Sequence, residues 1–147
     1  MVGSDQINSA WQDEGLAEYS TLMYFESHPE YGLTRTGIIG SATRAYRAFF
    51  TVYSQLNGEV NTSMSRNLAD YNSEFEYNNV IYNKGLILFD TLRSAIGDDA
   101  FKESLKKYYS ANCGKIASED ELLACFLKSG TDIEGLFNSF LQGKIII

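Results

Sequence analysis

The sequence predicts an all-α fold of about six helices. Only one proline occurs in 147 residues, and no long run alternates Val, Ile or Thr with polar residues as a β-strand does. Apolar residues instead recur at spacings of three and four, which is the period of a helix with a covered face. The length and the 44% hydrophobic content suit one domain, so we expect residues 1–147 to form a single helical lobe.

Capping residues and helix breakers predict where the helices begin and end. Ser9 with Gln12 has the pattern of a capping box and predicts a first helix that stops before Pro29. Asp98 or Asp99 is expected to cap the fourth helix. The six helices are expected at about 10–26, 34–56, 74–96, 99–110, 119–129 and 132–142, with capping boxes Ser118/Glu121 and Thr131/Glu134 opening the last two.

Charge and composition narrow the classes of partner. The chain has 12 Lys and Arg against 19 Asp and Glu, a net charge of -7, and no basic run that could follow a phosphate backbone, so nucleic acid is not an expected partner. No stretch approaches the ~18 consecutive apolar residues of a membrane span, and no secretion signal opens the chain. The compartment stays open, since a longer parent protein could be secreted or cytoplasmic.

Cys113 and Cys125 are interpreted as buried thiols, with a disulfide as the alternative.

Two carboxylates, Glu14 and Glu18, lie one turn apart on the first predicted helix. They share a stripe with Trp11 and Phe25 on a helix that has apolar residues on both sides, so this face is expected to be largely covered. Like charges at this spacing repel, and burying them unpaired costs more, so a cation is expected beside them; solvated carboxylates are the alternative. Gly15 costs ~1 kcal/mol relative to alanine inside a helix, which predicts the close approach of another backbone; neutral drift at this position is the alternative.

Short motifs follow one another in a fixed order along the chain. Residues 11–19 read Trp-Gln-Asp-Glu-Gly-Leu-Ala-Glu-Tyr, and residues 82–85 read Tyr-Asn-Lys-Gly. These segments resemble the W-x-N/D-E-G-x-A-x-Y and Y-x-K-G motifs of the aminopeptidase N family of zinc metallopeptidases, the gluzincins. Weaker continuations of the same pattern are Leu92-Arg93, 96–101, Tyr108-Tyr109, 129–133, Phe137 and 140–143.

The resemblance implies the helical lobe of a gluzincin-type, thermolysin-like catalytic domain. In that family the residue matching Glu14 is the third zinc ligand, and a water occupies the open position of the metal. The zinc activates this water and polarises the scissile carbonyl, and Tyr82 would donate its hydroxyl to the oxyanion. Packing beside Leu86 and Phe89 is the alternative for Tyr82. Glu18 is the candidate to orient a zinc-binding histidine, and a solvated carboxylate is the alternative.

The zinc-binding histidines of that family are missing from the sequence. His28 is the only histidine, no H-E-x-x-H occurs, and the family's spacing puts the second histidine before Met1. We therefore expect the C-terminal half of a catalytic domain, cut just after the H-E-x-x-H helix. The parent protein is expected to be a zinc aminopeptidase with peptide substrates, and the missing N-terminal half is the expected partner. The chain alone is expected to bind no zinc or other cofactor and to be inactive, since a single carboxylate is a poor zinc site.

A lobe that lacks its other half exposes the surface that the two halves share. We expect Trp11, Phe25 and the apolar tail at 145–147 to be exposed for this reason and to cause self-association that is not physiological. The alternative to an enzyme fragment is a non-catalytic helical module, either a peptidase-like scaffold or a domain that binds a peptide or protein.

Overall fold

The structure, a computed structural model, describes residues 1–127 and 133–147, and these residues form helices and no β-strand. The all-α prediction is therefore confirmed. The α-helices are α1 (Ala10–Ser27), α2 (Arg35–Asn57), α3 (Glu74–Tyr77), α4 (Lys84–Ile96), α5 (Asp98–Asn112), α6 (Glu119–Phe126) and α7 (Ile133–Leu141). The shorter elements are the 3-10 turns η1 (Pro29–Tyr31) and η2 (Leu68–Asp70) and the π-helical segment η3 (Asn78–Asn83). No helix in the described part of the chain is long and apolar enough to cross a membrane.

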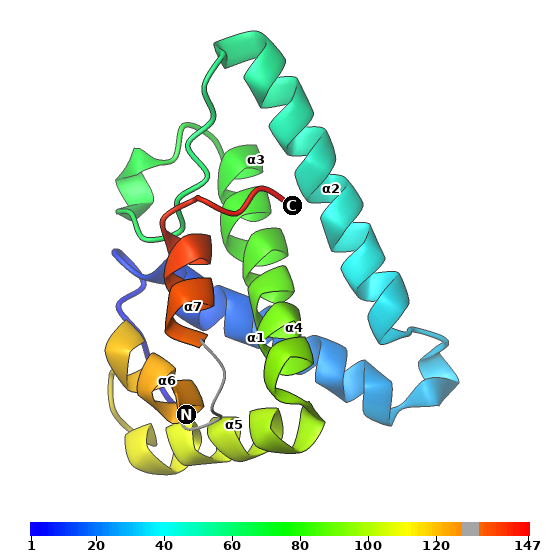
Figure 1. Cartoon of the computed structure of the whole chain (residues 1–147), viewed down its shortest axis with the longest axis vertical. Coiled ribbons are helices and arrows are strands. Elements are labelled where there is room, and N and C mark those ends of the chain that lie inside the picture. Colours follow the sequence, from blue (N-terminus) through cyan, green and yellow to red (C-terminus); the bar gives the residue numbers. More distant parts are fainter. Residues whose placement is uncertain (128–132) are drawn as a thin grey trace.

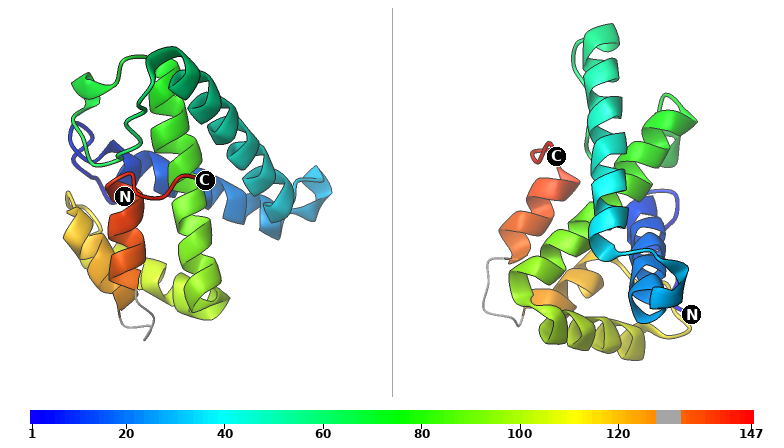
Figure 2. Two further views of the ribbon diagram at one scale, coloured as in Figure 1. Left: turned by 45° about the horizontal axis from the view of Figure 1, so that its top comes forward. Right: turned by 90° about the vertical axis from the view of Figure 1, so that its right-hand side faces the viewer.

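Helix α4 lies at the centre of the molecule. It contacts α1, α2, α5 and α7, and α1 crosses it (Figure 1). α2 lies on the opposite side of α4 from α7 in Figure 1 and in the left view of Figure 2. Only Ala42, Tyr46 and Phe49 of α2 are buried, so this helix covers the core with one narrow face and leaves the rest of its surface open.

Each predicted helix has a counterpart in the structure. α3, η3 and α4 follow one another without a break and correspond to the single helix predicted at about 74–96. α6 opens on the predicted capping box, in which Ser118 accepts a hydrogen bond from the backbone N–H of Glu121 and the Glu121 carboxylate accepts one from the backbone N–H of Ser118. The box predicted at Thr131 and Glu134 includes a residue that lies outside the described ranges.

Two predicted N-caps are wrong because the side chains involved have other partners. Ser9 makes no side-chain cap hydrogen bond, and the buried Gln12 donates instead to the carbonyl oxygens of residues 117–118, just before α6. Gly97, not an aspartate, precedes α5. Asp98 instead accepts two hydrogen bonds from the Arg93 guanidinium, at 2.8 and 2.7 Å. In both cases a tertiary contact replaces the local cap.

The prediction that Trp11 is exposed is wrong. Its side chain is fully buried, its ring lies edge-on to Phe137 of α7 with centroids 5.2 Å apart, and its indole N–H donates to Glu119 at 2.6 Å. Helix α7 and the start of α6 therefore cover the side of α1 that was expected to face a missing half. The apolar tail also has a place in this molecule, since Ile145 and Ile147 pack against the core.

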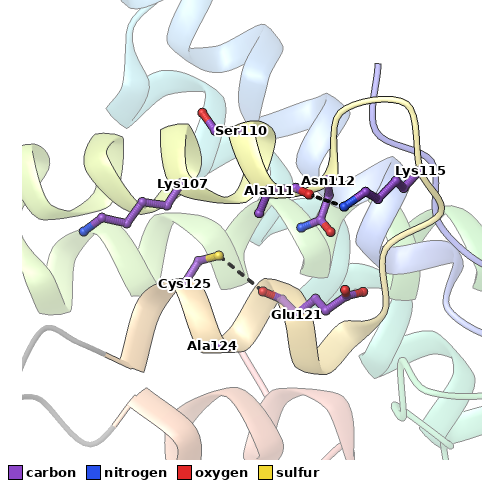
Figure 3. Close-up of a pocket in the computed structure, with 8 residues that line it drawn as sticks. All are labelled: Lys107, Ser110, Ala111, Asn112, Lys115, Glu121, Ala124 and Cys125. Carbon is purple, nitrogen blue, oxygen red and sulfur yellow. Dashed lines mark hydrogen bonds between the residues drawn. The ribbon is translucent and has the colours of Figure 1, made fainter.

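The cysteines differ from their interpretation as buried thiols. No disulfide joins them, Cys113 is exposed, and Cys125 is half-buried. Cys125 lies in a surface hollow of about 890 Å³ between α5 and α6 (Figure 3). Its thiol donates to the Glu121 carbonyl at 3.3 Å, and the Lys115 ammonium donates to the Ala111 carbonyl at 2.8 Å, so backbone carbonyls satisfy these polar groups (Figure 3). We assign no functional site to this hollow.

Candidate active site

Helices α1 and α4 cross at a pair of glycines, Gly15 and Gly85. A Cβ atom added to Gly85 would lie 2.8 Å from the Cα of Gly15, and one added to Gly15 would lie 3.0 Å from the Cα of Gly85. Real Cβ atoms essentially never approach another atom to 2.8 Å, and a contact of 3.0 Å is tighter than nine in ten, so a side chain at either position would push against the other backbone. The prediction that another backbone approaches Gly15 is confirmed, and the approaching residue is the glycine of the Y-x-K-G segment.

This crossing brings Glu14 and Tyr82 together, although they lie far apart in the sequence. Both side chains are half-buried. Burial first, and the neighbouring Glu14 carboxylate second, raise the pKa of the Tyr82 phenol well above its ordinary value. The hydroxyl of Tyr82 therefore keeps its proton across the physiological range and can act as a hydrogen-bond donor.

Glu18 lies one turn beyond Glu14 and is exposed, as is Thr21 on the same stripe. The prediction that this face is covered is therefore wrong for its outer half, because no described element packs over it. Glu18 still lies near enough to Tyr82 to contribute to its raised pKa, behind burial and Glu14. Within residues 1–127 and 133–147, the ion pairs involve neither Glu14 nor Glu18.

Tyr82 lies in the π-helical segment η3 and not in a regular α-helix. Tyr77, five residues earlier, packs edge-on against it, with ring centroids 5.7 Å apart and planes at 75°. The Glu14 carboxylate also raises the pKa of Tyr77, after burial. Sequence reasoning missed Tyr77 because residues five apart in an α-helix point about 140° away from each other. Tyr82 is less covered than Leu86 and Phe89, which are buried, but it also packs against the core, so packing stays the alternative for it.

Lys84, the third residue of the Y-x-K-G segment, points away from this site. Its side chain is fully buried, its ammonium donates to the Thr62 carbonyl at 2.7 Å, and burial lowers its pKa to about 8. The Thr62 hydroxyl in turn donates to the carbonyl of Gly143 at 2.9 Å. Lys84 therefore ties α4 to the loop before α3 and to the turn after α7.

Arg93 is a second cation on α4 that serves structure. Its guanidinium bonds to Glu26 at 2.5 Å and to Asp98 at 2.7 Å, which joins α4 to the end of α1 and the start of α5. This buried guanidinium already donates to Asp98, Glu26 and Tyr19, which leaves little of its capacity for a substrate.

Among the residues that the structure describes, Glu14 has too few candidate ligands around it to complete a metal site. In the described part of the chain, no three His, Cys, Asp or Glu side chains lie close enough together to hold a metal ion. Beside Glu18 and Asn83, a surface groove of about 670 Å³ runs along Leu86 and the first half of α2. The site thus consists of a carboxylate and a phenol at the side of an open groove.

The comparison with protein families decides the family of this arrangement. A family model described as the peptidase family M1 domain matches residues 1–140. The chain belongs to peptidase family M1. Its place in M1 supports a hydrolase of the metallopeptidase type, since M1 peptidases are zinc enzymes generally. No curated protein and no solved structure gives a significant match to this M1 chain.

Proposed function

We propose that this M1 chain is the helical lobe of a zinc-dependent aminopeptidase, in which Glu14 is a zinc ligand and Tyr82 stabilises the oxyanion. The observation that carries the proposal is the crossing at Gly15 and Gly85, which sets a carboxylate and a protonated phenol side by side on a half-open surface. Bound zinc would supply a Lewis acid that polarises the scissile carbonyl and activates a water.

The role of Tyr82 follows from its hydrogen-bonding chemistry. As water attacks the peptide carbonyl, negative charge grows on the carbonyl oxygen, and a hydroxyl placed beforehand stabilises that charge more than the starting carbonyl. Because the pKa of Tyr82 is raised, its hydroxyl is still protonated when the donor is needed. Removing one donor of this type from other hydrolases lowers kcat by about 10²–10³-fold.

Glu14 and Glu18 are assigned different tasks. The half-buried Glu14 would bind the metal, while the exposed carboxylate of Glu18 would accept a hydrogen bond from a zinc-binding histidine and so fix the orientation of its ring. Both histidines would come from the N-terminal half of the catalytic domain. The open face of α1 would contact that half, and the groove beside Glu18 would hold part of a peptide substrate.

The first test is the coding sequence upstream of Met1 together with the protein that the whole reading frame encodes. We expect an in-frame H-E-x-x-H and hydrolysis of amino-acid amides by the purified protein. Tyr82→Phe is expected to lower kcat by about 10²–10³-fold at unchanged zinc content, and Glu14→Gln is expected to lower the zinc content itself. Metal analysis and initial rates measure both.

The matched control is Tyr53→Phe, since Tyr53 is also half-buried but its hydroxyl bonds to Ser73, away from the site. This variant is expected to keep the wild-type zinc content and the wild-type rate of hydrolysis. A reading frame without H-E-x-x-H, or full activity in Tyr82→Phe, contradicts the proposal and favours a non-catalytic helical scaffold or binding module.

A further inference from the structure

A ladder of three tyrosines leads from the loop before α3 to the candidate site. The rings of Tyr71 and Tyr77 meet edge-on, with centroids 5.2 Å apart and planes at 90°, and Tyr77 meets Tyr82 in the same way at 5.7 Å. Edge-to-face contacts are the arrangement that aromatic rings prefer, because the positive edge of one ring faces the negative face of the other. Each ring in the ladder therefore restricts the next.

The far end of the ladder is anchored by a buried ion pair. The guanidinium of Arg66 lies over the Tyr71 ring, 3.8 Å from its centroid, and bonds to the Glu76 carboxylate at 2.6 Å. Both charged side chains are almost fully covered, at 8% and 2% exposure. Glu76 also accepts hydrogen bonds from the backbone and side-chain nitrogens of Asn72. Tyr71 thus rests on a group that cannot easily move.

The contact between Tyr77 and Tyr82 depends on the π-helical geometry of η3. In an α-helix these two positions would point about 140° apart, and their rings could not meet. A π-helical turn holds more residues, so positions five apart lie nearly one above the other. π-helical turns occur frequently at functional sites, where they redirect a side chain.

Tyr82 needs such a support because its own surroundings leave it room to move. The side chain is only half-buried, and the surface on its outer side, which carries Glu18, is open. Both Tyr77 and Tyr82 face the Glu14 carboxylate, which raises the pKa of each phenol after burial. Tyr77, the last residue of α3, is itself half-buried and packs against both the core and the Tyr82 ring.

We propose that Tyr77 is a positioning residue for Tyr82: the π-helical turn places its ring edge-on against the Tyr82 ring and holds the Tyr82 hydroxyl beside Glu14. The importance of this placement for catalysis rests on the proposed function, but the contact and its effect on Tyr82 do not. Tyr77 acts through its ring, so its own hydroxyl is dispensable.

The experiment measures the side-chain rotamer of Tyr82 in the 147-residue chain by three-bond NMR couplings on tyrosine-labelled protein. Tyr82 is expected to occupy one χ1 rotamer in the wild type and in Tyr77→Phe, and to average over several in Tyr77→Leu. The control is Phe75→Leu, which removes an exposed ring from the same helix, outside the ladder, and is expected to leave Tyr82 unchanged.

A single Tyr82 rotamer in Tyr77→Leu overturns the proposal, as does equal averaging in the Phe75→Leu control. If Tyr77→Leu loses the native circular dichroism spectrum, Tyr77→Met, whose side chain fills more of the space without a ring, takes its place under the same criteria.

In the full reading frame, Tyr77→Leu is expected to lower kcat about 10-fold with KM unchanged. Failure of Tyr82→Phe to affect hydrolysis would refute the proposed function alone, because the rotamer measurement does not depend on activity.

Discussion

At the scale of single residues, Lys84 and Arg93 show how charged groups on the central helix serve structure beside the site. Both are almost fully buried and both join α4 to neighbouring segments. They differ in their partners. Arg93 has two carboxylates, whereas the Lys84 ammonium has one backbone carbonyl and lies over the Tyr46 ring, 5.9 Å from its centroid. Burial of an amine with so few partners disfavours its charged form and so lowers its pKa.

The burial of Lys84 predicts a pH dependence of stability. Its pKa is lowered to about 8 in the folded protein, against about 10.4 in an unfolded chain. Between these values the unfolded chain binds more protons than the folded one, so the free energy of unfolding rises with pH across this window. The rise is expected to be about 3 kcal/mol in full, and tyrosines with raised pKa values oppose it above about pH 10.

Lys84→Met is expected to remove this rise. Urea unfolding at several values from about pH 7 to about pH 9.5 measures the slope in both proteins. A wild-type chain whose stability stays flat over this range, or a variant that keeps the same slope, would show that another group is responsible.

At the scale of elements, the crossing of α1 and α4 is the contact on which the candidate site depends. Each glycine lowers the intrinsic stability of its helix. In return, the missing side chains let the two backbones approach closely. A wider crossing would separate Glu14 from Tyr82. The glycines are therefore part of the geometry of the site even though neither has a side chain.

Alanine at Gly85 or Gly15 is expected to force the helices apart. Each substitution should destabilise the chain by about 2 kcal/mol or more, because the added methyl group meets backbone atoms that cannot rotate away. The control is Gly40→Ala in α2, where the new Cβ would meet only the flexible end of Arg44, at 3.4 Å. It should stabilise by about 0.5–1 kcal/mol. Chemical denaturation compares the three, and equal effects would refute this interpretation of the crossing.

At the scale of the whole molecule, the lobe covers its own apolar core more completely than expected. Trp11 is buried by α7, and Ile145 and Ile147 pack on the core. The outer side of α1 and most of α2 stay open, with Leu56 75% and Val52 47% exposed. Self-association of the isolated lobe therefore remains a prediction, but α2 now accounts for more of the apolar surface than Trp11 does.

The isolated 147-residue chain is expected to bind no stoichiometric zinc and to hydrolyse no amino-acid amide. Glu14 provides one carboxylate, and zinc sites in proteins use three or four ligands that include imidazole or thiolate. Metal analysis of the purified chain after incubation with zinc, followed by a rate assay, measures both properties. One zinc per chain together with hydrolysis would show that the lobe is complete by itself.

Sequence reasoning reached the helical class, the positions of the helices and the identity of Glu14 and Tyr82 as candidate site residues. It also predicted a close approach at Gly15, because a helix-interior glycine has a cost that needs a reason. The helix and glycine predictions rest on effects that act within a few residues, such as capping at Ser118, whereas the resemblance to the aminopeptidase N family identified Glu14 and Tyr82. Local effects of this kind can be read from a single segment.

The sequence by itself determined which residues are candidates, and only the tertiary structure decided how they are combined. Packing made Gly85 the partner of Gly15, gave Gln12 distant backbone partners in place of a local cap, and covered Trp11 with α7. The π-helical turn that joins Tyr77 to Tyr82 also breaks the regular period that sequence patterns assume. The physical reason is the same throughout: long-range packing sets which of several acceptable faces is buried, and no single segment carries that information.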